Sequence, residues 1–283
     1  MNNTFKKRKK TNLKYIFKNP PVIIGLLIVT IVFLLAFFPT LFTKYNPNAL
    51  SPSEVLKHPS KLHLFGTDNF GRDVFARVIW GTRVDLQLGI FSMIIPLIAG
   101  SFIGLITGYY GKWIDMLFMR ILDITMAFPF TVLVITIMSI LGQGIKNVYF
   151  AIWIIGWMVF ARLVRAEVII IKNSEYIQAA RIAGFNDRKI IFRHILPNAI
   201  SPAVVYATSY IVICMLTGAS MSFLGLGVEP PTPEWGALMS EGRSYIQIAP
   251  WMTIYPGIFL AATGIGFSLL GDGITDFLRT KGR

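Results

Sequence analysis

The chain has 283 residues, of which 54% are hydrophobic and only 14% are charged, whereas a soluble domain carries about a quarter charged residues. This composition excludes an ordinary soluble domain and predicts an all-α integral membrane protein, because several uncharged runs are long enough for bilayer-crossing helices. The net charge of +13 would suggest nucleic acid as a partner of a soluble protein, so its distribution along the chain decides its meaning. The single cysteine, Cys214, excludes a disulfide within the chain.

The N-terminal part of the chain predicts a first membrane span behind a basic tail. The tail, residues 1–21, carries seven basic residues and no acidic one. Residues 22–42 hold no charge and are long enough to form the first transmembrane helix. That run is too long for the apolar core of a signal peptide, and no small-residue cleavage site follows it, so we expect the span to be retained.

A polar connection and a glycine-marked span come next. Residues 43–83 are rich in Pro, Asn and Ser, and we expect residues 73–80 to form an amphipathic helix at the extracytoplasmic membrane interface. Residues 86–111 form an uncharged run that is more than long enough to cross a bilayer. Gly100, Gly104 and Gly108 recur there at four-residue spacing. This spacing indicates a ridge for close helix packing, and the alternative is that the glycines face lipid.

Four further spans are predicted in the rest of the chain, which makes six transmembrane helices in all. They are residues 124–145, the segment from Asn147 that continues as a charged helix through Glu167, residues 199–224 and residues 251–271. Residues 112–123 predict a charged turn. Residues 225–250 predict a polar connection, in which three closely spaced prolines rule out regular structure around Pro231. Residues 276–283 are a short cytoplasmic tail.

Six spans place both termini on one side of the membrane, and the basic residues indicate which side. With the termini inside, the inner segments hold 19 basic residues and the outer segments hold 8, while the acidic residues divide seven to seven. The positive-inside rule therefore predicts that both termini lie in the cytoplasm. This asymmetry, together with attraction to anionic membrane lipid, accounts for the net charge without a nucleic-acid partner.

A polar, basic stretch of about two dozen residues, Ser174–Asn198, lies between two apolar runs on the cytoplasmic side. Its first half predicts a helix with a small-residue patch made of Ala179, Ala180 and Ala183. Gly184 suits the left-handed residue that ends such a helix. Asn186 predicts the N-cap of a second helix, which Pro197 is expected to end. A small-residue face lets another protein's backbone come close, and the alternative is an amphipathic loop without a partner.

The spacing in this stretch resembles the EAA loop of ABC-importer permeases. Two alanines, three residues, a glycine, eleven residues and a Leu-Pro pair match that pattern at Ala179, Ala180, Gly184, Leu196 and Pro197. The resemblance implies that residues 172–198 form a cytoplasmic coupling loop that docks on an ATPase, with Gln178, Arg181 and Ala183 also taking part. Gln178 stands where many members carry Glu, and His194 where many carry Ile. The resemblance therefore does not establish a need for a carboxylate at residue 178.

Three further blocks resemble the C-type subunits of dipeptide, oligopeptide and nickel importers. They are FGTDNFGRDVFARVIWGTR at residues 65–83, FLGLGVEPPTPEWG at residues 223–236 and LLGDGITDFL at residues 269–278. The shorter motifs AFP at residues 127–129 and ARLVRAE at residues 161–167 also fit. The resemblance covers the chain from about residue 65 to its end. It implies a type I ABC-importer permease fold whose core is formed by residues 84–275.

Two of these blocks predict shaped helix ends at the extracytoplasmic mouth. The block at residues 65–83 predicts a capped helix start with Arg72 paired to Asp73, and the block at residues 223–236 predicts a helix end turned by glycines and prolines. We expect these residues to shape the mouth and its docking surface rather than to contact substrate. The residues are Arg72, Asp73, Gly225, Gly227, Pro230, Pro231 and Trp235.

No catalytic site, resident metal or cofactor is predicted from the sequence. His58, His63 and His194 lack metal-ligand spacing with any acid or cysteine, and we expect the first two to be solvated outside the membrane. No glycine-rich phosphate loop of Walker type is present, so ATP would be bound by partner subunits. No charge falls in the middle of five of the six predicted spans. This weakens the alternative of an ion-coupled secondary transporter.

The resemblance implies a multi-pass subunit of an ATP-driven importer for di- or oligopeptides in the cell membrane. Nickel or a metal chelate stays open as the alternative cargo. The implied partners are a homologous B-type permease that completes a heterodimer, two cytoplasmic ABC ATPases and an extracytoplasmic solute-binding protein. The chain itself is expected to be a transport subunit and not an enzyme.

Overall fold

The computed structural model describes residues 19–281, with side chains as far as residue 275. The basic residues of the predicted tail at residues 1–21 and the last residues of the predicted tail at 276–283 therefore lie largely outside the described part. Between residues 19 and 281 the chain is helical, and it holds no β-strand beyond one isolated bridge between Thr67 and Asp73. The predicted all-α class is confirmed for this part of the chain.

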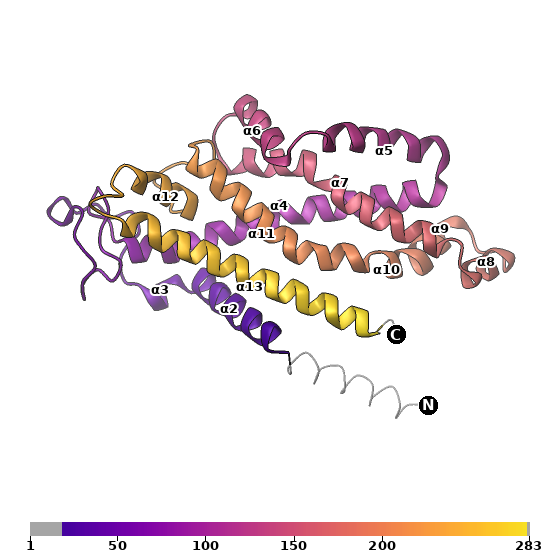
Figure 1. Cartoon of the computed structure of the whole chain (residues 1–283), viewed down its shortest axis with the longest axis horizontal. Helices are drawn as coiled ribbons and strands as arrows, with labels where there is room; N and C mark the ends of the chain where they lie inside the picture. The colour runs from indigo at the N-terminus through magenta and orange to yellow at the C-terminus, as the bar shows by residue number, and fades with distance from the viewer. Residues whose placement is uncertain (1–18, 282–283) are drawn as a thin grey trace. The chain divides into compact units, whose positions relative to one another are not determined.

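The helices follow one another along the chain as Figure 1 shows. They are α2 (Pro20–Phe37), α3 (Pro39–Phe42), η1 (Pro52–Glu54), α4 (Val74–Tyr110), α5 (Lys112–Met126), α6 (Phe130–Leu141), α7 (Ile145–Ile171), α8 (Glu175–Ile182), α9 (Asp187–Lys189), η2 (Ile190–Ile195), α10 (Leu196–Ala199), α11 (Ser201–Phe223), α12 (Trp235–Arg243) and α13 (Trp251–Lys281). The predicted first span at residues 22–42 is therefore two helices, α2 and α3, which meet at Phe38.

Within the described residues, four helices are long and apolar enough to cross a membrane. They are Pro20–Phe37, Val74–Tyr110, Ser201–Phe223 and Trp251–Thr275 within α13. The pair of α5 and α6 makes a fifth candidate, although its two helices are bent by 89°. Pro129 occupies the N-cap of α6 with an extended ψ of 131°, so the predicted span at residues 124–145 is broken there.

The predicted charged turn at residues 112–123 is wrong, because this segment is most of α5. Its charged residue Asp115 is placed where a helix is stabilised by it. Asp115 lies in the first turn of α5, where the positive end of the helix dipole stabilises a carboxylate. It also pairs with Arg165 of α7 at 2.6 Å. The remaining positions are mostly apolar, so α5 is an amphipathic helix and not a connection.

The chain divides into two compact units. Of the described residues, one unit comprises 19–89, 143–145 and those from Thr208 onward. The other comprises Ile90–Gly142 and Lys146–Ala207. In the first unit α13 packs against α2 and α12, and Figure 1 shows α2 beside α13. A Cβ on Gly25 would lie 2.9 Å from the Gly266 carbonyl oxygen, so α2 and α13 approach at their backbones.

In the second unit the glycine ridge packs against α7. A Cβ on Gly100 would lie 2.2 Å from the Trp157 carbonyl oxygen, and one on Gly104 would lie 2.3 Å from that of Ala161. A Cβ on Gly108 would lie 2.8 Å from the side chain of Val168. The three glycines thus remove the side chains that would hold α4 away from α7, as small residues do in membrane helices.

The predicted amphipathic helix at residues 73–80 is not a separate interfacial helix, because it forms the first turns of α4. Val74, Arg77, Val78 and Ile79 are all buried, so this segment has no broad solvent face. The burial comes from α12, whose Trp235 donates an indole hydrogen bond of 3.0 Å to the Val78 carbonyl. Arg77, the charged residue that gave this segment its amphipathic pattern, is therefore buried and belongs to an internal ion pair.

Candidate functional site

The predicted coupling helix is α8, and its end has the geometry of a Schellman motif. Gly184 has a φ of +78°, the left-handed conformation that the sequence predicts. The backbone N–H of Phe185 donates to the Ala180 carbonyl at 3.1 Å, and that of Gly184 donates to the Arg181 carbonyl at 3.0 Å. No atom lies within 4 Å of the position that a Cβ on Gly184 would take. The glycine is needed for its backbone conformation and not for space.

The small residues of α8 do not share one exposed face. Ala180 is buried together with Ile177, on the side of the helix that packs against η2. Ala179, Ile182 and Ala183 are exposed, and 89% of the Ile182 side chain is accessible. Ala180, which the sequence predicts as part of the same small-residue patch, therefore lies on the other side of α8. The spacing of alanines could not reveal which side of a short helix the rest of the loop covers.

The second half of the loop begins with the predicted N-cap but does not end at the proline. The side chain of Asn186 accepts a hydrogen bond from the Lys189 N–H at 3.0 Å. Leu196 has helical backbone angles of −53° and −47°, so the chain stays helical through Pro197. The preceding stretch, η2, is a π-helix in which the Leu196 N–H donates to the carbonyl of Ile191, five residues back. This wider turn accommodates a proline that an α-helix would not.

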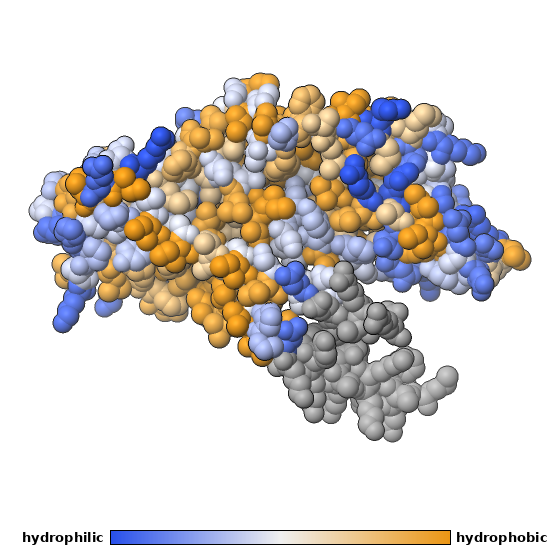
Figure 2. Space-filling view, in the orientation of Figure 1, coloured by the Kyte–Doolittle hydropathy of each residue, from blue (hydrophilic) through white to orange (hydrophobic). Residues whose placement is uncertain are grey.

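Charged residues tie the loop back onto its own unit. The guanidinium of Arg181 lies 5.5 Å from the centre of the Tyr109 ring, at the end of α4. Lys189 lies 3.7 Å from the ring centre of Phe185. Gln178 is exposed and donates to the Asn173 carbonyl at 3.2 Å. Figure 2 shows a mainly hydrophilic surface over α8 and α9, in keeping with a loop outside the bilayer.

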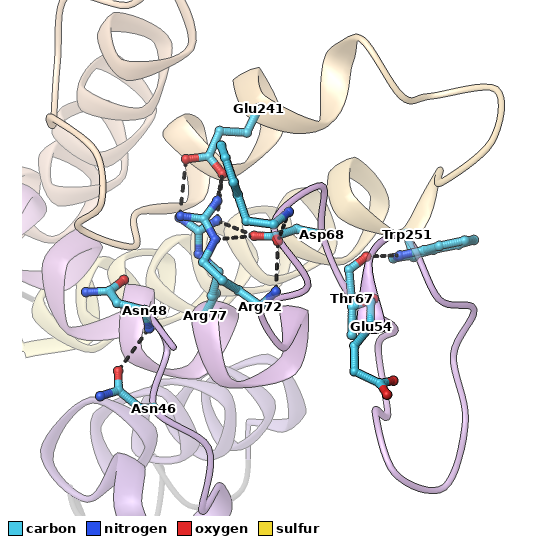
Figure 3. Close-up of polar contacts among 10 residues, drawn as sticks. Asn46, Asn48, Glu54, Thr67, Asp68, Arg72, Arg77, Glu241 and Trp251 are labelled. Atoms are coloured by element: carbon cyan, nitrogen blue, oxygen red, sulfur yellow. Dashed lines mark hydrogen bonds and ion pairs between the residues drawn. The ribbon is translucent and has the colours of Figure 1, made fainter. Parts of the chain in front are cut away.

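A buried ion-pair cluster holds the start of α4 to α12. Asp68 accepts hydrogen bonds from Arg72 at 2.5 Å and from Arg77 at 2.7 Å. Glu241 of α12 accepts from both arginines at 2.6 Å. Figure 3 shows Glu241 reaching toward the two guanidinium groups, with Asp68 on their other side. Two cations and two carboxylates balance in this cluster, which we call the arginine cluster.

The predicted pairing of Arg72 with Asp73 is wrong. Asp73 is the N-cap of α4, where one carboxylate oxygen accepts from the Ala76 N–H at 2.6 Å. Its other oxygen lies 2.8 Å from Nδ1 of His63. His63 is buried with 7% of its surface exposed, so the prediction that it is solvated is also wrong. His58 is exposed and packs on the Trp251 ring, at 4.7 Å between ring centres.

Trp235 lies in the interior of its unit and not on a docking surface. It is fully buried, and its backbone N–H donates to Asp85 at 3.0 Å. Glu234 caps α12 by accepting from the backbone N–H groups of Gly236 and Ala237. Burial raises the pKa of the Glu234 carboxyl. The helix α12 and its cap were missed in the predicted connection at residues 225–250, because glutamate is not among the residues that usually mark an N-cap in a sequence.

The remaining predicted mouth residues divide between surface and interior. Gly225 has a φ of +79° and is exposed, as are Pro230 and Pro231. Gly227 is buried, and a Cβ there would lie 2.2 Å from Oγ of Ser222. The chain between α11 and α12 is a series of turns, as the prolines predict. Of the seven predicted mouth residues, only these three exposed ones could meet a partner.

A family model described as "Binding-protein-dependent transport system inner membrane component" matches residues 100–282. The dipeptide transport system permease protein DppC of Alkalihalophilus pseudofirmus is 45% identical over 268 residues, which cover 95% of this chain and 88% of that protein. The glutathione transport system permease protein GsiD of Pectobacterium atrosepticum is 42% identical over 256 residues, or 90% of this chain and 85% of that protein. The protein of the same name from Escherichia coli O157:H7 is 41% identical over 90% of this chain and 84% of its own length.

Proposed function

The chain belongs to the family of binding-protein-dependent transport system inner membrane components, and from that premise we propose that it imports di- or oligopeptides as the permease subunit of an ABC transporter. Such a subunit is a component of transport and not a catalytic enzyme. The dipeptide and glutathione permeases that resemble it over most of its length support a peptide cargo. Nickel or a metal chelate remains the alternative that an uptake assay must test.

The observation that carries the coupling role is the exposed face of α8. Ala179 and Ala183 are small and exposed, and Ile182 between them is an apolar side chain with 89% of its surface accessible. Two small residues beside an exposed isoleucine let the backbone of another protein come close, and burial of the isoleucine in a groove of that protein would remove apolar surface from water. We define Ala179, Ile182 and Ala183 as the docking face, and its partner would be a cytoplasmic ATPase.

The proposed topology has six spans with both termini in the cytoplasm. The four long apolar helices and the bent pair α5–α6 supply five. The sixth is α7, which has 27 residues and carries Lys146 at its start and its other charged positions in its second half. The charge asymmetry of the sequence places the loop at residues 172–198 on the cytoplasmic side, where an ATPase can reach it.

The proposed assembly contains a second, homologous permease of B type, two ABC ATPases and an extracytoplasmic solute-binding protein. ATP would be bound and hydrolysed by the ATPases, and the docking face would pass their closure to the permease. The binding protein would supply most of the selectivity, since the exposed residues at the predicted mouth are few: Gly225, Pro230 and Pro231.

The docking face is tested by enlarging a residue that faces outward. Ala179→Trp should block the groove by bulk while leaving the packing of the loop intact, because Ala179 is exposed. Ala179→Ser keeps the small size and is the matched control. The measurement is capture of the ATPases by the tagged permease pair in detergent. Equal capture with Trp and Ser would remove the docking face from the mechanism.

The cargo is tested by uptake in a strain that lacks the chromosomal copy of this subunit. Labelled dipeptide, oligopeptide, glutathione and nickel are supplied in parallel, with and without the plasmid-borne chain. Restoration of peptide uptake alone supports the proposal. Restoration of nickel uptake alone would replace the peptide cargo with the metal, while leaving the permease assignment in place.

A further inference from the structure

The last turn of α4 contacts both halves of the coupling loop through a single side chain. The hydroxyl of Tyr109 donates a hydrogen bond of 2.6 Å to Oδ1 of Asp187, the first residue of α9. The ring of Tyr109 lies under the guanidinium of Arg181, which belongs to the last turn of α8. Because Gly184 lies between residues 181 and 187, Tyr109 bridges the two sides of the hinge.

A third contact fastens the start of the loop to the same turn of α4. The ammonium group of Lys172, which directly follows α7, donates a hydrogen bond of 2.7 Å to the Gly108 carbonyl. Carbonyls in the last turn of a helix lack partners within the helix and carry partial negative charge, so a lysine is well matched there. The loop is therefore attached to residues 108 and 109 before, at and after its first helix.

These ties act together with the backbone hydrogen bonds that Gly184 and Phe185 donate, which also restrain the hinge. No atom lies within 4 Å of a Cβ placed on Gly184, so side-chain packing does not fix the angle at that point. The apolar interior of the loop is formed by the buried residues Ile177, Ala180 and Ile190. The hydroxyl of Tyr109 is not part of this interior. The loop can thus fold by its own apolar contacts, while its orientation relative to α4 depends on the polar ones.

From this geometry we infer that Tyr109 is a positioning residue that locks the docking face to the end of α4, so that displacement of α8 by an ATPase moves α4. The inference rests on the proposed coupling function and deepens it. Tyr109 is 8% exposed, so it is not itself a surface that the ATPase could bind. Its role is transmission of the movement, which is separable from attachment of the ATPase.

The test uses the complete transporter, reconstituted with both permeases, the ATPases and the binding protein. Tyr109→Phe keeps the ring beneath Arg181 and removes the bond to Asp187, whereas Tyr109→Leu removes both. We expect labelled dipeptide imported per ATP hydrolysed to fall by about two- to tenfold in Tyr109→Phe, the range of one net hydrogen bond, and further in Tyr109→Leu. Capture of the ATPases should equal that of the wild type. Tyr110→Phe, at the neighbouring and 46% exposed tyrosine, is the matched control and should change neither quantity.

The conservative partner variant separates positioning from general damage. Asp187→Asn keeps an oxygen that can accept from Tyr109, so it should preserve the import ratio, which is the labelled dipeptide imported per ATP hydrolysed. Asp187→Ala should lower this ratio as Tyr109→Phe does. The double variant Tyr109→Phe, Asp187→Ala should fall no further than either single variant, because both remove the same bond. Additive losses would show that the two residues act separately and would overturn the inference.

Two other results would also overturn it. One is an unchanged import ratio in both Tyr109 variants. The other is loss of ATPase capture in Tyr109→Phe, since the residue would then be needed to build the loop. If the proposed coupling function is wrong, the result is different: Ala179→Trp then retains wild-type capture of the ATPases and wild-type uptake of dipeptide. Ala179→Trp therefore tests docking of the ATPase, whereas the import ratio of the Tyr109 variants tests transmission of the movement, so the two failures are distinguishable.

Discussion

At the scale of single residues, Gly184 is required by its backbone angle and not by its surroundings. Its φ is +78°, and a side chain there would meet open space. Gly184→Val should therefore cost about 1 kcal/mol or more through backbone strain alone. If that strain is relieved by tilting α8, the affinity of the permease pair for the ATPases should fall about fivefold. This is the change that about 1 kcal/mol produces, because 1.4 kcal/mol corresponds to a tenfold change in a dissociation constant.

Gly184→Asn is the control for that prediction, because asparagine visits the left-handed region more readily than valine. Titration of the ATPases against each immobilised variant measures the difference. Asn should retain most of the capture. If Asn and Val weakened capture equally, the backbone angle would not be the cause.

The arginine cluster gives a second prediction at this scale. Asp68 is 1% exposed and accepts from two buried arginines, so Asp68→Ala leaves a net positive charge inside the protein. Removing one partner of a buried ion pair costs about 3–5 kcal/mol. We expect a marked fall in the thermal unfolding midpoint of the purified protein in detergent.

The exposed pair of Lys57 and Glu54 is the control for charge removal. Their side chains are 53% and 27% exposed and lie 2.8 Å apart. Lys57→Ala should cost about 0–1 kcal/mol, because water screens such pairs. A midpoint for Asp68→Ala as high as that for Lys57→Ala would mean that water enters the arginine cluster.

What could be predicted at this scale was local chemistry. The left-handed Gly184 and the cap at Asn186 depend on neighbours within a few residues, and the sequence shows those neighbours. The pairing of Arg72 with Glu241 could not be predicted, because Glu241 is 169 residues away. Its pairing with Asp68 is local, but the nearer carboxylate of Asp73 competed for the assignment. The burial of Ala180 depended likewise on η2, whose π-helical turn has no clear sequence signal.

At the scale of helices, the contact between α4 and α7 depends on missing side chains. Gly104 faces the Ala161 carbonyl at a distance that no Cβ contact tolerates. Gly104→Ala should therefore separate the two helices and lower the thermal midpoint, and Gly104→Leu should lower it further. Overpacking of this kind typically costs about 1–3 kcal/mol.

Gly257, within α13, is the matched control for Gly104. A Cβ there would make an ordinary contact of 3.5 Å with Sδ of Met239. Gly257→Ala should be neutral or slightly stabilising, since alanine favours a helix by about 0.5–1 kcal/mol over glycine. Equal destabilisation by both alanines would mean that α4 and α7 do not rely on this contact.

Helix boundaries were predicted less well than helix existence. The sequence identifies the long apolar runs, because twenty uncharged residues have few other uses. It does not show that residues 73–80 continue into α4 or that residues 112–123 are helical, since charged residues on a helix look the same as charged residues in a turn. In each segment one charged residue is an ion-pair partner of another helix: Arg77 pairs with Glu241, and Asp115 pairs with Arg165.

At the scale of the whole molecule, the proposed topology makes a prediction that does not depend on any one contact. Reporter fusions after Lys18, near Lys112, near Arg188 and after Arg283 should report the cytoplasm. Fusions near Ser53, Lys146 and Glu234 should report the outside. The reason is the excess of basic residues on the inner segments. An external signal near Arg188 would contradict the coupling role of the loop.

The overall class and the family resemblance could be established from sequence, because blocks near Phe65, Ala179, Phe223 and Leu269 occur in a fixed order. The count of spans could not be settled in the same way. The bent pair α5–α6 has a break of about 90° at Pro129, and a proline alone does not distinguish a kinked span from two separate helices. The predicted number of six therefore rests on charge and resemblance, beyond the five that length and apolarity supply.

The arginine cluster also has a consequence for how the chain is made. Arg77 meets Asp68 only 9 residues back, but it meets Glu241 164 residues ahead. At a synthesis rate of about 5–20 residues per second, Glu241 leaves the ribosome roughly 10–30 s after Arg77. During that interval the nascent protein carries two arginines against one local carboxylate, so the start of α4 stays incomplete until α12 has been synthesised. A chain that stalls before residue 241 should thus be a preferred substrate for membrane quality-control proteases, and pulse-labelling of truncated chains would measure that lifetime directly.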